Sequence, residues 1–197
     1  MAHRKILVLD GHPAATSLSR HLTESYAETA RSAEHEVALR HLSDLTFDMD
    51  FEHSHYRDAK PLEPDLQDIM DQLVWADHFV LVTPLWWGGL PAKLKALFDR
   101  AFLPGLAFDT RKTNWMGMPA PLLSGRTAQL IVTADTPGWF QRFAYQSAVQ
   151  RATHRQILRF VGMRPRRSLW FSGASQANER QVSGWRRKVE RAALAVA

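Results

Sequence analysis

Residues 79–102 read FVLVTPLWWGGLPAKLKALFDRAF, and this stretch contains the pattern that decides the fold. Residues 79–83 form a short, continuous apolar run, which is typical of a buried strand. Glycines and prolines then interrupt the run, as they do in a turn. Apolar residues next recur at helical spacing, at Leu94, Leu97, Phe98, Ala101 and Phe102. A strand, a turn and a helix in this order predict one unit of a parallel α/β sheet.

The same alternation recurs along the rest of the chain. The predicted strands are Lys5 to Asp10, Glu36 to Arg40, Phe79 to Thr83, Thr127 to Thr133 and Ser168 to Phe171. Core-facing helical stripes are predicted at Leu22, Tyr26 and Ala30, at Leu66, Ile69, Met70, Leu73 and Val74, and at Trp185, Val189, Ala192, Ala193 and Val196. Pro64 and Pro91 are expected in first helical turns, where a missing N–H is tolerated. Five parallel strands with helices on both faces predict a doubly wound sheet that binds ligands beyond the carboxyl ends of its strands.

The length of 197 residues predicts one domain, residues 1–197, and the sequence contains no internal repeat or interdomain linker. Two stretches, Leu42 to Pro61 and Leu103 to Gly125, have weak periodicity. We expect both to be long excursions from the sheet. Loops of this length in a small domain usually carry function or an interface.

Composition excludes several classes of function. The chain has no cysteine, so disulfides, thiolate catalysis and cysteine-ligated metal sites are excluded, and any redox chemistry needs an organic cofactor. It also has no apolar run long enough to cross a bilayer or to form a signal peptide, and we expect a cytoplasmic protein without stable membrane insertion. The net charge is +5, with basic residues concentrated in residues 164–167 and 186–188. We interpret them as a solvated basic face that attracts anionic ligands, and expect no nucleic-acid partner.

The first predicted strand ends at Asp10 and leads into a stretch rich in hydroxyl groups before the next helix. Unpaired N–H groups and the helix dipole favour a phosphate at such a helix start, and the hydroxyls of Thr16, Ser17 and Ser19 can add donors. Simple N-capping by one hydroxyl is the open alternative. Neither G-x-G-x-x-G nor a P-loop motif follows the strand, so a monophosphate fits better than a dinucleotide or a nucleoside triphosphate.

Two further turns follow strand ends. After Thr83, the adjacent Trp86 and Trp87 cannot both point into the core, so at least one indole is expected near the surface, where it could contact a flat ring. After Thr133, the turn Ala134-Asp135-Thr136-Pro137 could direct backbone amides towards the polar edge of such a ring. Ordinary packing of the tryptophans and a plain helix start at Thr133 remain the alternatives.

Three segments together resemble a known family. They are Gly11-His12-Pro13 with Ser17-Leu18-Ser19; Thr83 to Trp87 continued by Pro91 to Lys95 and Phe98-Asp99-Arg100; and Leu122 to Ala128 followed by Thr133 to Pro137. In this order they resemble the flavodoxin-like NAD(P)H dehydrogenase (quinone) family, and in particular its bacterial members. The resemblance implies a flavodoxin-like doubly wound sheet of five parallel strands in the order 2-1-3-4-5.

The resemblance also implies the cofactor and where it binds. FMN, in preference to FAD, would be held by its phosphate at His12, Ser17, Leu18 and Ser19. Its ring would contact Pro84, Leu85, Trp86, Trp87 and Gly88 on one side and Thr133, Ala134, Asp135 and Thr136 on another. No metal site is implied, and a metal at the histidines His53 and His55 is disfavoured because a mobile loop pair is a poor ligand set.

The activity implied by the resemblance is ping-pong electron transfer. NAD(P)H, the co-substrate, gives hydride to the flavin, and a quinone, azo or nitroaromatic acceptor then takes two electrons. Tyr145 and His154 stand nearest to a tyrosine and a histidine that assist catalysis in mammalian members, although their spacing differs. Many relatives have an aromatic residue where this chain has Gly88, so we expect a wider pocket. The family also implies a homodimer in which residues 47–56 approach the partner's site.

Two other functions compete with a free-standing reductase. Some relatives are flavin-binding regulatory subunits of a membrane potassium-efflux system. An electron-carrying flavodoxin is the other, but the basic pI of about 9.9 disfavours it because such carriers are usually acidic.

Overall fold

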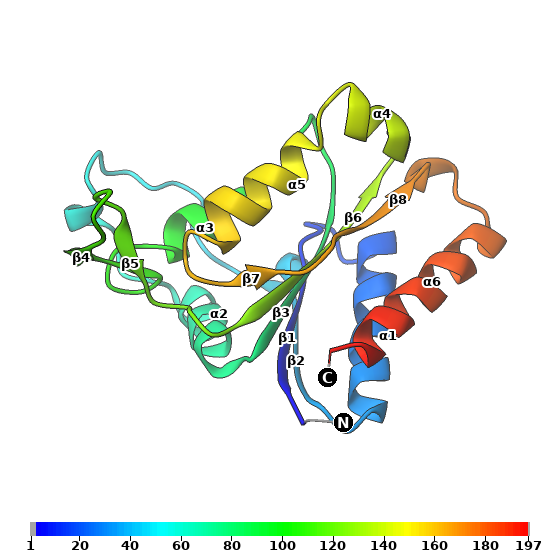
Figure 1. Ribbon diagram of the computed structural model, residues 1–197, viewed down its shortest axis with the longest axis horizontal. Helices are drawn as coiled ribbons and strands as arrows, with labels where there is room; N and C mark the ends of the chain where they lie inside the picture. The colour runs from blue at the N-terminus through cyan, green and yellow to red at the C-terminus, as the bar shows by residue number, and fades with distance from the viewer. Residues whose placement is uncertain (1–2, 197) are drawn as a thin grey trace.

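The computed structural model describes residues 3–196, and its central element is a parallel sheet covered by helices on both faces (Figure 1). The sheet contains β1 (Lys5–Asp10), β2 (Glu36–His41), β3 (His78–Pro84), β6 (Thr127–Ala134), β7 (Arg164–Pro165) and β8 (Leu169–Ser172). Its strands are ordered β2-β1-β3-β6-β7, and β8 also pairs with β6. The predicted doubly wound topology and the order 2-1-3-4-5 are therefore confirmed, although the sheet has six strands instead of five.

Two short strands share the fifth position, where the sequence predicted one strand from Ser168 to Phe171. β7 pairs with Thr127 and Ala128, and β8 pairs with the carboxyl half of β6 from Ile131 onwards. Pro165 has no N–H to donate, so a continuous ladder cannot form here. Between the two strands the side-chain amide of Gln129 donates to the carbonyl oxygen of Arg167 and takes the place of ladder bonds.

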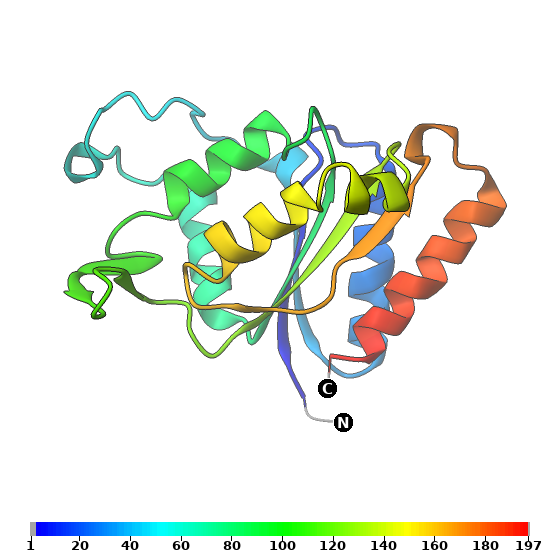
Figure 2. The same ribbon diagram turned by 45° about the horizontal axis from the view of Figure 1, so that its top comes forward.

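The helices divide between the two faces of the sheet (Figures 1 and 2). α1 (Leu18–Ser32) and α6 (Glu179–Leu194) pack on the face that carries Ile6 and Val8. α2 (Pro64–Trp75), α3 (Ala92–Ala101) and the π-helical segment η3 (Thr153–Leu158) pack on the face that carries Leu7 and Leu9. Alternate side chains of β1 thus pack into two separate hydrophobic cores, one on each face of the sheet.

The predicted helical stripes are largely buried, with one exception. Val74 is 55% exposed, because it directly follows the buried Leu73 and so points away from the core face of α2. Pro64 opens α2 as predicted, whereas Pro91 is the residue that caps α3.

Both excursions contain short regular elements. The first includes the 3₁₀ turns η1 (Leu42–Asp44) and η2 (Tyr56–Asp58), and the second includes a hairpin of β4 (Phe108–Thr113) and β5 (Pro119–Pro121). Beyond β6, the chain forms α4 (Gly138–Phe143), α5 (Ala148–Ala152) and, after β8, the 3₁₀ turn η4 (Ala174–Gln176). The hairpin and the first excursion project at the same end of the molecule in both views (Figures 1 and 2).

Arg100 fastens the first excursion to α3. Its side chain is 1% exposed. The guanidinium donates to both carboxylate oxygens of Glu63, at 3.1 and 2.9 Å, and also to the carbonyl oxygens of Pro61 and Asp48. A bidentate pair with two further carbonyl acceptors is the arrangement that makes a buried arginine favourable. The loop therefore takes its position from a helix residue.

We expect Arg100→Met to destabilise the protein by about 3 kcal/mol, because the change strands Glu63 and two carbonyls without their donor. Urea denaturation followed by circular dichroism measures the loss. Lys95→Met is the control on the same helix, since it removes an exposed pair with Asp99 and should cost less than about 1 kcal/mol. Equal losses in the two variants would show that Arg100 does not anchor the loop.

Candidate functional site

The three segments predicted to form a site meet at the carboxyl edge of the sheet. β1, β3 and β6 lie side by side and end at Asp10, Pro84 and Ala134 (Figure 1). The Leu85 N–H donates to the Thr133 carbonyl oxygen at 2.9 Å. This bond ties the loop after β3 to the end of β6.

The start of α1 is tied to the same edge. The hydroxyls of Ser19 and Thr133 lie 3.3 Å apart, and both residues are buried. The Ser19 hydroxyl is thus directed towards the sheet, so only its backbone N–H is available to a ligand at the helix start. The Ser17 hydroxyl caps α1 by accepting from the Arg20 N–H at 3.0 Å, and Thr16 beside it is exposed. The open N–H groups of the first turn suit an anion.

Asp10 shapes the loop that leads to α1. Its carboxylate is fully buried and accepts from the His12 N–H at 3.1 Å, while His41 at the end of β2 places Nδ1 3.4 Å from the other oxygen. Burial raises the pKa of the Asp10 carboxyl, and the contacts with His12 and His41 oppose that rise. Both carboxylate oxygens are thus engaged, one by the His12 N–H and one by His41. Nothing in the sequence pairs His41 with Asp10, because the contact depends on strand register.

Gly11 and His12 connect the loops across the edge. The Gly11 N–H donates to the Val82 carbonyl oxygen at 2.7 Å. A side chain at this glycine would come within 2.7 Å of a methyl carbon of Leu94, so the close approach requires glycine. The His12 ring meets the Trp86 indole edge to face at 5.5 Å between centroids. The first and second predicted segments are therefore in direct contact.

Residues 86–89 form a tight hairpin turn. Trp86 and Gly89 exchange two backbone hydrogen bonds, at 3.0 and 2.9 Å. The two central residues, Trp87 and Gly88, have φ values of 49° and 76°. This left-handed backbone suits Gly88 but is unusual for a tryptophan, and such strain tends to occur at ligand sites. Trp86 is 44% exposed and Trp87 is completely exposed, so both indoles of the predicted pair reach the surface.

The turn after β6 is held by β8 and by the 3₁₀ turn η4 that follows it. The Asp135 carboxylate accepts from the Ser175 N–H at 2.7 Å, and the Thr136 carbonyl oxygen accepts from the Trp170 indole N–H at 3.1 Å. Thr133 and Ala134 are buried. Both belong to β6 and pair with β8, and the Thr133 carbonyl oxygen accepts from Leu85, so these two residues mainly hold the edge together.

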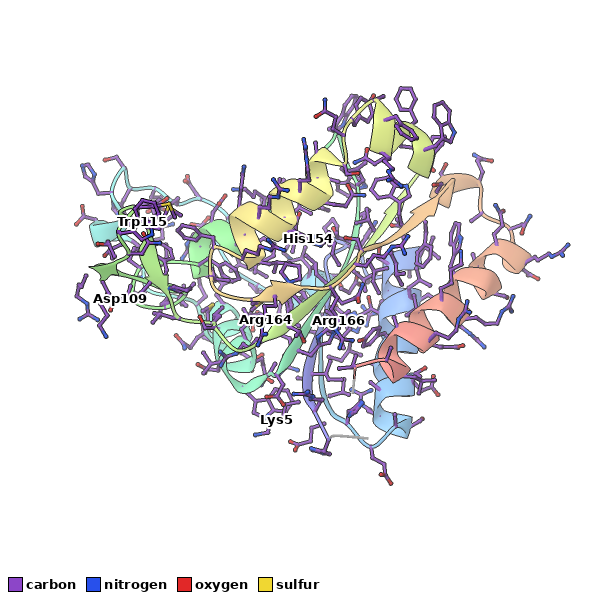
Figure 3. All side chains as sticks on the ribbon, viewed as in Figure 1. Lys5, Asp109, Trp115, His154, Arg164 and Arg166 are labelled. Carbon is purple, nitrogen blue, oxygen red and sulfur yellow. The ribbon has the colours of Figure 1, made fainter. Side chains whose placement is uncertain are left out.

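The two proposed catalytic residues occupy different environments. Tyr145 is 55% exposed and meets Phe140 edge to face. His154 lies between α5 and the β7–β8 segment (Figure 3), and its Nε2 is 3.0 Å from the Ser168 hydroxyl. Partial burial lowers the pKa of His154. Within residues 3–196, no hydrogen bond or ring contact joins His154 to Tyr145. Their catalytic roles stay predictions.

A cavity of about 1080 Å³ adjoins the Trp86–Gly89 turn. Gly88 and Gly89 line one part of it, and Ala148, Val149 and Ala152 of α5 line another. Much of its wall is aromatic: Phe51, Tyr56, Phe98, Phe102, Phe108 and Phe160. The sequence placed Phe98 and Phe102 in a core stripe, and no signal marked Phe108 or Phe160. Polar groups of His53, Ser54, Lys95, Asp99, Thr153 and Gln156 also line it. A mainly apolar cavity with some polar groups suits a small aromatic molecule.

The residues at the sheet edge fit FMN in their chemistry. A helix of 15 residues begins with open N–H groups and hydroxyls, and the nearby carboxylate of Asp10 is buried with both oxygens in contact with His12 and His41. This set favours a phosphate. The exposed indoles and the glycine of the next turn supply a surface for a flat ring. Residues His12 and Ser17 to Ser19 would face the phosphate, and residues 84–88 and 133–136 would face the ring.

Residues 3–196 contain neither a metal-ligand cluster nor a membrane-spanning helix. No three histidine, aspartate or glutamate side chains gather there as metal ligands, including His53 and His55. Likewise, none of the helices in this range combines the length and the apolar character that crossing a bilayer requires.

Comparison with known proteins identifies the family to which this chain belongs. A family model described as flavodoxin-like fold matches residues 4–192. An uncharacterized NAD(P)H oxidoreductase of Haemophilus influenzae is 24% identical over 160 residues, which cover 80% of this chain and 78% of the relative.

Two solved structures show the same fold. An NAD(P)H:quinone oxidoreductase from Methanothermobacter marburgensis has a TM-score of 0.83 at 21% identity, covering 100% of both chains. An FMN-dependent NADH-azoreductase from Bacillus anthracis, solved with FMN, has a TM-score of 0.71 at 18% identity, covering 98% of both chains. The sequence match extends over nearly the whole chain. This protein belongs to the family with the flavodoxin-like fold.

Proposed function

We propose that the protein is an FMN-dependent NAD(P)H oxidoreductase that passes two electrons to a quinone or similar acceptor in a ping-pong reaction. The observation that carries this proposal is the meeting of three segments at one sheet edge: the start of α1, the tryptophan turn and the turn after Thr133. The names of the relatives from Haemophilus influenzae and Methanothermobacter marburgensis support it. The FMN complex of the azoreductase supports the choice of cofactor.

The protein's part in this reaction is to bind and to orient. Bound FMN would supply the redox chemistry, since its ring can carry two electrons from NAD(P)H to an acceptor. The first turn of α1 would hold the phosphate, and the Trp86–Gly89 turn would fix the plane of the ring. The cavity beside Gly88 would admit the acceptor. Tyr145 would contact the acceptor at most from the rim, because its ring is exposed.

Flavin binding is the first test. The purified protein should take up FMN, and its flavin absorption bands should bleach with NAD(P)H and return with a quinone. A protein that neither binds FMN nor oxidises NAD(P)H would refute the proposal.

Thr16→Glu places a negative charge at the start of α1 and should weaken FMN binding by about tenfold or more without affecting riboflavin, which has no phosphate. Ser32→Glu, at the far end of the same helix, should leave both affinities unchanged.

The role of Gly88 can be tested by restoring an aromatic side chain. Gly88 lines the cavity, and a Cβ there would have no heavy atom within 4 Å. We expect Gly88→Phe to slow the reduction of large acceptors, because the ring would narrow the cavity, and to spare small ones such as benzoquinone. Gly88→Ala controls for the strained backbone, since it adds the same φ penalty without the ring. If Gly88→Ala slows large acceptors relative to small ones as much as Gly88→Phe does, the backbone at residue 88, and not the width of the cavity, determines specificity.

We also propose that the protein is a homodimer, as its family resemblance implies. The first excursion supports this, because it projects from the domain and exposes Met49 (53%) and Tyr56 (65%), and Tyr56 also lines the cavity. Apolar side chains on a projecting loop suit a protein contact. Sedimentation equilibrium should give twice the chain mass of 22.5 kDa, and Tyr56→Asp should shift the equilibrium towards the monomer. A parent protein that sediments as a monomer at micromolar concentration would contradict the proposal.

A further inference from the structure

An aromatic ridge covers the outer side of α4, immediately after the turn that ends β6. We define the ridge as Trp139, Phe140, Phe143 and Tyr145, which are 66%, 37%, 75% and 55% exposed. Trp139 meets Phe140 edge to face at 5.5 Å, and Phe140 meets Tyr145 edge to face at 5.2 Å. Ring-bearing side chains project outward from α4 (Figure 3). Four large apolar side chains gathered on one short segment indicate a binding surface.

The ridge is held rigidly in place. Gly138 lies against Trp170, whose indole N–H donates to the Thr136 carbonyl oxygen at 3.1 Å. On the inner side, Gln141 is 3% exposed, and its side-chain amide donates to Gln150 of α5 at 3.0 Å. The connection to α5 contains two successive left-handed residues, Gln146 and Ser147, with φ values of 49° and 52°. Such strain is maintained only when the surroundings determine the backbone, and it clusters at ligand sites.

The part of the sequence that contains the ridge is rich in arginine. Between Asp135 and Glu179 the sequence contains seven arginines and no aspartate or glutamate. None of these arginines forms an ion pair within residues 3–196. Arg142 belongs to the ridge itself, because its guanidinium lies over the Phe143 ring, 5.8 Å from the centroid. The ridge therefore offers aromatic faces and one uncompensated cation.

The position of the ridge relates it to the proposed flavin site. α4 begins two residues after Thr136, and in both views the loop after β3 rises next to the connection between α4 and α5 (Figures 1 and 2). Gly88 of that loop and Ala148 at the start of α5 line the same cavity. The ridge residues do not line that cavity themselves, but α4 leads directly into α5, whose first residue does, so a molecule on the ridge would lie beside the cavity.

From these observations we propose that the ridge binds the electron acceptor, and that the preferred acceptor is a planar aromatic anion such as a sulfonated or hydroxylated naphthoquinone. Trp139 and Phe143 stack on its rings, and Arg142 pairs with its negative substituent. The inference rests on the proposed function, which supplies the electrons: quinone, NAD(P)H and a proton give hydroquinone and NAD(P)⁺. The ridge itself binds and orients only.

Matched acceptors test the proposal on the flavin-loaded protein. Arg142→Gln should lower kcat/KM for naphthoquinone sulfonate about tenfold, as expected when a charge-assisted contact is lost. The effect on unsubstituted naphthoquinone and on benzoquinone should be less than about twofold. Trp139→Leu and Phe143→Leu should lower kcat/KM for both naphthoquinones and leave benzoquinone unchanged. Arg180→Gln, an exposed arginine of α6, is the matched control and should change none of these values.

A binding measurement distinguishes failure of the ridge proposal from failure of the proposed function. Calorimetric titration with naphthalene sulfonate, which cannot be reduced, should show binding to the parent protein and about tenfold weaker binding to Arg142→Gln. If no acceptor is reduced at all, the proposed function fails, while this titration still tests the ridge. If benzoquinone is reduced but Arg142→Gln and Trp139→Leu treat all acceptors alike, only the ridge proposal fails. A shift in the KM for NADPH alone would assign the ridge to the dinucleotide, and a change in sedimentation mass would assign it to a subunit contact; either result overturns the proposal.

Discussion

The pairing of β3 with β1 on one side and β6 on the other is the constraint on which the rest of the structure depends. Every residue of β3 is buried, and parallel register carries the ends of all three strands to one edge. The loops that follow these strands must then converge there. The Leu85–Thr133 backbone bond and the Ser19–Thr133 hydroxyl contact fix the loops to one another. The helix start proposed to hold the phosphate and the turn proposed to hold the ring therefore adjoin as a consequence of topology.

The polar groups at this edge have two different roles: some hold the loops together and others remain open to a ligand. The Asp10 carboxylate and the Ser19 hydroxyl are buried and hold the loops, which leaves backbone N–H groups and exposed rings towards a ligand. Backbone donors are rigid and lose little entropy on binding. This division suits a protein that binds a cofactor and leaves the chemistry to it.

The acceptor side of the proposed site is built from segments outside the sheet. Arg100 positions the first excursion, and Trp170 and Gln141 position α4. These anchors are buried side-chain contacts between distant parts of the chain. They allow an exposed, strained or apolar surface, such as Trp87 or the aromatic ridge, to persist in water at the cost of some stability. In the proposed function, acceptor specificity and the fold would thus depend on different residues.

From local apolar periodicity and turn residues such as Pro84, Gly88 and Pro137, the sequence predicted the two-sided covering of helices and the three loops at the carboxyl edge, and through its resemblance to a family it also predicted the strand order. It did not reveal the split of the last strand at Pro165, the exposure of Val74 or the Asp10–His41 pair. It also gave no sign that the Ser19 hydroxyl is turned inward or that His154 faces Ser168. Only the tertiary structure decided these points, because each depends on contacts between residues far apart in the chain, and such contacts leave no period in the sequence.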